Sequence, residues 1–103
     1  MTKHRWINDD TDELMLALLE LENLAEARAF LGDLFTHSEI EEAAKRWKAV
    51  KMLNFGASYR KVERITGMSS ATISRIKRVM EQGAGGYALM IGKLQETENC
   101  SSS

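Results

Sequence analysis

Apolar residues recur along this chain at helical spacing, and polar capping residues divide the pattern into six segments. Leucine, isoleucine, phenylalanine and methionine return every three or four positions, as they do on the packed face of an amphipathic helix. A side-chain oxygen can cap the following helix at three places, namely Asn23, Ser58 and either Ser69 or Ser70. The predicted helices span residues 10–21, 24–35, 37–54, 59–66, about 69–82 and about 87–96.

Two further signals mark helix starts near the N-terminus. The acidic run 9–13 can cap the first helix and match its dipole. The sequence Thr36-His37-Ser38-Glu39 fits a capping box, in which the Thr hydroxyl and the Glu carboxylate each accept an unpaired backbone N–H. Gly56 and Gly67 are expected to end the third and fourth helices.

Residues 58–78 have the layout of a helix-turn-helix. Gly67 is expected at the turn, because glycine adopts positive φ without steric cost. The helix after the turn would then be free to lie in a DNA major groove. The apolar positions expected to hold the motif together are Val62, Ile65, Met68, Ile73 and Ile76.

Length and composition predict an all-α protein with one main domain. The chain has 103 residues and no proline, which suits a mostly helical fold. We expect a mobile N-terminal tail at 1–9, a single helical domain at 10–97 with the helix-turn-helix at 58–82, and a disordered tail at 98–103. No apolar run approaches the roughly 20 residues of a membrane span, and no signal peptide is visible, so a cytoplasmic location is expected.

Charge is distributed unevenly along the chain. Residues 1–44 carry 3 Lys/Arg against 11 Asp/Glu, whereas residues 45–78 carry 10 Lys/Arg against Glu63 alone. A basic patch that coincides with a helix-turn-helix is typical of a polyanion-binding surface. A solvated charged face is the alternative interpretation.

Six short helices give one chain of this length a thin core. Small domains bury a lower share of their surface, and the first two helices and the last are rich in apolar residues. We therefore expect some of this surface to face a second copy of the chain. A symmetric dimer would also set two recognition helices about 34 Å apart, one turn of DNA.

The order of these elements resembles the Trp repressor family, and within it the short bacterial YerC/YecD-type branch. The resemblance runs from about Leu34 to Arg78. Its strongest parts are Phe35-Thr36, Arg46, Gly56 and the run Ser69-Ser70-Ala71-Thr72-Ile73-Ser74-Arg75. It implies a six-helix, all-α fold, an intertwined homodimer and binding to double-stranded operator DNA.

The resemblance also implies which residues meet DNA. Ser70, Ala71, Thr72 and Ser74 fall where the family approaches base edges, and Arg60 falls on a phosphate- and base-contacting position. Basic side chains nearby are expected to neutralise phosphates, with Lys45 and Lys48 of the third helix as further contacts. The predicted DNA-binding residues are Arg60, Lys61, Arg64, Ser69, Ser70, Ala71, Thr72, Ser74, Arg75, Lys77 and Arg78.

The family's tryptophan site is matched only in part. Arg46 and Arg75 occupy the positions of the two arginines that enclose the indole, and Thr36 lies near a further contact. The glycine that follows the second arginine in the Trp repressor is Ile76 here. A branched side chain there is expected to fill the indole space, so no cofactor is predicted, although an amino-acid or other small ligand remains an alternative.

The sequence is compatible with two other functions. A helical module whose basic face meets an acidic protein is one alternative, and a helix-turn-helix module of a transposase or sigma-like system is another. An enzyme is not expected, because no paired carboxylates, Cys/His or Ser/His/Asp constellation shares a plausible face. No metal is expected, because the two histidines are isolated from each other in the sequence.

Overall fold

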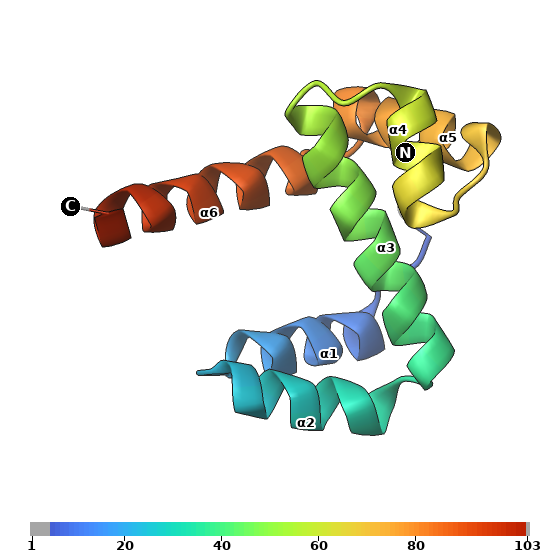
Figure 1. The fold of residues 1–103 in the computed structure, drawn as a ribbon. Helices are drawn as coiled ribbons and strands as arrows, with labels where there is room; N and C mark the ends of the chain where they lie inside the picture. The colour runs from blue at the N-terminus through green and yellow to red at the C-terminus, as the bar shows by residue number, and fades with distance from the viewer. Residues whose placement is uncertain (1–4, 103) are drawn as a thin grey trace. The chain divides into compact units, whose positions relative to one another are not determined.

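The computed structural model describes residues 5–102, and within them the chain is all-α. Six helices and no strand occur in this range, as expected (Figure 1). The helices are α1 (Asp9–Leu19), α2 (Leu24–Leu34), α3 (His37–Asn54), α4 (Tyr59–Thr66), α5 (Ser70–Gln82) and α6 (Gly86–Ser102).

The chain divides into two compact units, one ending at Ile40 and the other beginning at Glu41. The sequence carries no signal for this boundary, which falls within α3. The first unit contains α1 and α2, in which no residue is buried. The second contains most of α3 and all of the last three helices.

The helices of the first unit begin at asparagine caps. Asn23 caps α2 as predicted, because its side-chain oxygen accepts the N–H of Glu26 at 2.9 Å. The cap of α1 is Asn8 rather than the acidic run, and it exchanges hydrogen bonds with Thr11 in a capping box. Asn8 takes this role because its short amide reaches the third helical N–H, and the acids then follow within the first turn.

The start of α3 is the predicted capping box. The Thr36 hydroxyl accepts the Glu39 N–H at 3.1 Å, and the Glu39 carboxylate accepts the Thr36 N–H at 2.9 Å. At the other end, Gly56 takes φ 89° and turns the chain toward α4. A polar capping box therefore sets the start of this helix, and a glycine at positive φ follows its end.

The core of the second unit surrounds the helix-turn-helix, and α4 and α5 pack against each other (Figure 1). One predicted core residue is wrong: Ile65 is 43% exposed. Thr66 is buried in its place, because it lies one helical turn after Val62 and its hydroxyl donates to the Val62 carbonyl at 2.7 Å. The buried apolar residues are Ala49, Val50, Leu53, Val62, Met68, Ile73 and Ile76.

The last helix is longer than predicted. We expect a helix from 87 to about 96 and disorder over 98–103, but α6 extends from Gly86 to Ser102. No proline or glycine follows Gly92, and glutamate and glutamine are good helix formers, so nothing in the backbone stops the helix. The predicted mobile segment 1–9 lies outside the described residues over 1–4, and residue 103 also lies outside them.

Candidate nucleic-acid interface

The turn between α4 and α5 is built by local hydrogen bonds. Ser58 caps α4 by accepting the Lys61 N–H at 3.1 Å. Gly67 ends α4 with φ 77°, a conformation in which any other residue would be strained. The Thr66 hydroxyl then accepts the Met68 N–H at 3.2 Å, which fixes the turn against the core.

The outward face of α5 carries most of the predicted base contacts. Helical spacing places Ser70, Ala71, Ser74, Arg75 and Arg78 on one side, and all five are exposed. Ile73 and Ile76 lie on the opposite side and are buried. The core therefore holds the helix so that its short polar side chains and two arginines point into solvent.

Ser69 and Thr72 are placed differently from the other predicted contacts. The Ser69 hydroxyl accepts the Thr72 N–H at 3.2 Å and donates to the Thr72 hydroxyl at 3.0 Å. Both hydroxyls thus serve the N-terminal cap of α5, and Thr72 is half-buried. Lys77 is also half-buried, and its ammonium lies 3.8 Å from the Glu81 carboxylate.

The basic residues of α4 lie on its solvent side. Arg60, Lys61 and Arg64 are all exposed, while Val62 and Thr66 face the core. The predicted contacts on α4 and on the outward face of α5 are therefore exposed. We call these exposed residues, at which DNA contact is predicted, the DNA face.

The two arginines of the possible ligand site line one pocket. Arg46 and Arg75 line a pocket of about 150 Å³ with Thr72, Ile76 and Tyr87. Thr36, the third predicted ligand residue, lies in the first unit, where its hydroxyl caps α3. Ile76 is buried at the wall of this pocket, whose volume is below the roughly 300 Å³ at which small-molecule pockets begin.

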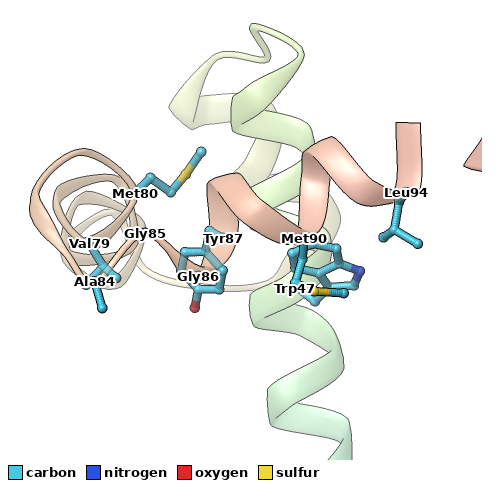
Figure 2. Close-up of a pocket in the computed structure, with 9 residues that line it drawn as sticks. All are labelled: Trp47, Val79, Met80, Ala84, Gly85, Gly86, Tyr87, Met90 and Leu94. Carbon is cyan, nitrogen blue, oxygen red and sulfur yellow. The ribbon is translucent and has the colours of Figure 1, made fainter. Parts of the chain in front are cut away.

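A larger pocket beside it was not predicted from the sequence. It has a volume of about 580 Å³ and is almost entirely apolar, with Trp47 and Met90 on one wall and Tyr87 between the helices (Figure 2). The Trp47 and Tyr87 rings lie 6.2 Å apart, tilted by 34°. The sequence signal that could have found it is the pair of aromatic residues on the facing sides of α3 and α6.

Within residues 5–102, no group of three or more His, Cys, Asp or Glu side chains is arranged to hold a metal ion. No described helix is both long and apolar enough to cross a bilayer.

Comparison with known proteins identifies relatives over most of the chain. Residues 9–95 match the family described as Trp repressor protein. The protein YerC of Bacillus subtilis is 40% identical over 94 residues, which cover 91% of this chain and 90% of that protein.

Two solved structures have the same fold. A candidate Trp repressor from Staphylococcus aureus matches with a TM-score of 0.84 and 35% identity, covering 92% of this chain and 95% of that one. A TrpR-like protein from Eubacterium eligens matches with a TM-score of 0.85 and 32% identity, covering 90% and 96%. The resemblance seen in the sequence is therefore confirmed, and this chain belongs to the Trp repressor family, a family of DNA-binding helix-turn-helix regulators.

Proposed function

We propose that this protein is a sequence-specific transcriptional regulator, acting in the cytoplasm as a repressor, that reads operator DNA through α5. The observation that carries the proposal is the outward face of α5, where three short side chains and two arginines are exposed on a rigid core. Family membership supports the same assignment. Nothing in this assignment calls for catalysis.

The residues of the DNA face divide into two roles. Ser70, Ala71 and Ser74 can touch a thymine methyl or make single hydrogen bonds, directly or through water. Arg75 is long enough for a bidentate pair with guanine. The basic side chains of α4, with Arg78 of α5, would neutralise phosphates and give an affinity that falls as salt rises.

We propose that the regulator acts as a homodimer. α1 and α2 bury no residue, and Leu16, Leu19 and Leu24 are largely exposed. Helices of this length are marginal alone in water, so their apolar side chains need a partner surface. A second copy supplies one, and the apolar pocket beside Trp47 offers space for such side chains.

We propose that tryptophan is not the corepressor. The pocket between Arg46 and Arg75 is small, and Ile76 forms part of its wall. The two arginines are then available to contact phosphates or bases, since both are exposed.

One experiment tests specificity, dimerisation and the corepressor together. Selection of bound sequences from a random duplex pool, run with and without tryptophan, should enrich an inverted repeat that is the same in both conditions. Half-sites about one DNA turn apart would support the dimer. Enrichment of no sequence would contradict operator reading, and enrichment only with tryptophan would contradict the corepressor proposal.

A variant pair then tests the DNA face itself. Arg60→Ala should weaken binding to all duplexes and reduce the dependence of log affinity on log salt by about one phosphate contact. Arg28→Ala is the matched control, because Arg28 is an exposed arginine of the acidic first unit. If gel-shift titrations gave wild type and Arg60→Ala the same affinity for duplex DNA, the DNA-binding surface would have to lie elsewhere on the protein.

A further inference from the structure

A basic groove lies where α3 ends and α4 begins, and no residue of α5 lines it. Its volume is about 680 Å³. Lys48, Lys51 and Lys61 contribute to its walls, and no carboxylate does. All three lysines are exposed, and the ion pair found among the described residues, between Lys77 and Glu81, involves none of them.

The groove also has an exposed apolar surface. Phe55 lines it and is 75% exposed, although it directly follows a helix that is anchored in the core. Its position is fixed by the turn, because the Ala57 N–H donates to the Met52 carbonyl at 3.0 Å and Gly56 takes positive φ. Met52 and Ala57 are half-buried and form the adjoining apolar lining.

This combination of residues fits a protein segment better than a DNA backbone. Phosphates need cations, but they gain nothing from an exposed phenylalanine. Lys61, although counted among the predicted phosphate contacts of α4, lies about 100° around the helix from Arg60 and lines the groove. Lys48, which the sequence suggested as a phosphate contact, lines the groove as well.

We propose that this groove docks an acidic protein segment that carries an apolar side chain. Carboxylates of the segment would pair with the three lysines, and its apolar side chain would pack on Phe55 and Met52. Charge complementarity selects the partner, because the lining contains three cations and no anion. The regulator would then hold DNA through α5 and an acidic protein through the α3–α4 corner, a role beyond operator binding.

Fluorescence anisotropy with a defined probe tests the docking site. The probe is a labelled peptide of alternating glutamate and aspartate with one leucine–phenylalanine pair at its centre. Wild type should bind it at least tenfold more tightly than a peptide with two alanines in place of that pair. Equal affinity for the two peptides would overturn the proposal, since it would leave only non-specific attraction between charges.

Variants separate this groove from the DNA face. Lys51→Glu and Phe55→Ala should each weaken peptide binding at least tenfold and leave affinity for the selected duplex within about twofold. Arg60→Ala should do the reverse, so failure of the operator proposal and failure of this one give different results. Phe55 is exposed, so its replacement should keep the far-UV circular dichroism of wild type.

Three further results would overturn the docking site. The first is unchanged peptide binding by Phe55→Ala. The second is displacement of the peptide by the duplex together with loss of duplex binding by Lys51→Glu, which would make the groove a phosphate site. The third is a loss of dimer by Phe55→Ala in analytical ultracentrifugation, which would make Phe55 part of the contact between copies.

Discussion

The helix-turn-helix and the first two helices place similar apolar residues in opposite environments. In α4 and α5, Val62, Ile73 and Ile76 are buried within the chain's own core. In α1 and α2 no residue is buried, and Leu19 is 77% exposed. The same two regions also differ in charge, since the helix-turn-helix is basic and the first two helices are acidic.

This difference shows that helical periodicity alone does not tell where an apolar face is covered. The apolar face of α5 packs on residues of α3 and α4 of the same chain, whereas the apolar faces of α1 and α2 are at most half-buried. Stability of the DNA face should therefore depend little on protein concentration. Stability of the first unit should depend on it strongly.

The largest effect is expected in the self-contained core. Ile73→Ala removes a fully buried side chain and should lower the free energy of unfolding by about 2–5 kcal/mol. Urea unfolding at several protein concentrations measures it. Leu16→Ala, in exposed α1, is the comparison variant. At protein concentrations too low for association, it should lower the free energy of unfolding by less than Ile73→Ala does. If both variants lost the same free energy of unfolding at such concentrations, the two regions would not differ in how their apolar residues are covered.

The next effect should appear in association rather than in folding. Leu19→Glu places a charge on the exposed leucine of α1 and should weaken the dimer by about 2 kcal/mol, roughly thirtyfold in dissociation constant. Sedimentation equilibrium gives this constant directly. Leu19→Met is the conservative control. A monomeric wild type would show that the leucines are covered by something other than a second copy.

The turn of the helix-turn-helix should be sensitive to any side chain. Gly67→Ala puts a Cβ on a residue with φ 77° and should cost about 1–2 kcal/mol. Gly32→Ala, inside α2, should instead stabilise the protein. A Cβ at this position meets no atom within 4 Å, and alanine has a helix propensity about 1 kcal/mol better than glycine. Thermal unfolding of both variants should show shifts of opposite sign.

A smaller effect is expected at the cap of α3. Thr36→Ala removes the hydroxyl that accepts the Glu39 N–H and should cost about 1 kcal/mol. Thr36→Ser keeps the hydroxyl and should retain most of the stability. Chemical denaturation of the two variants separates the capping role from any role in ligand binding, because only the latter would change a calorimetric titration with tryptophan.

The smallest effect belongs to the ion pair on α5. Glu81→Gln removes the partner of Lys77 at the solvent-exposed edge of the helix and should cost roughly 0.3 kcal/mol. The loss should vanish in high salt. A loss above about 1 kcal/mol that persists in high salt would mean that this pair helps to position the recognition helix.

The starts of α2, α3, α4 and α5 could be predicted from the sequence because they depend on local chemistry. Asn23, Thr36, Ser58 and Ser69 cap the helices that follow them, and Gly67 takes the left-handed conformation expected of it. Helical spacing also predicted that Val62, Ile73 and Ile76 are buried.

Features that depend on tertiary packing could not be predicted in this way. Ile65 is more apolar than Thr66, but Thr66 lies on the inner side of α4. Its hydroxyl donates to the Val62 carbonyl and accepts the Met68 N–H there. The pocket beside Trp47 combines Trp47 of α3 with residues between Val79 and Leu94, so helical periodicity within one segment does not indicate it. The groove at Phe55 lies within residues 48–61, but its shape depends on how the turn at Gly56 places α4 after α3.

Trp47 gives the protein an intrinsic optical reporter. Its ring lies 6.2 Å from Tyr87 and 5.9 Å from the Lys51 ammonium, and it lines the apolar pocket on α3. The chain has two tryptophans, so Trp6→Phe leaves Trp47 as the sole indole emitter. When apolar side chains fill the pocket and exclude water, its emission should shift to shorter wavelength, and association can be followed without a label.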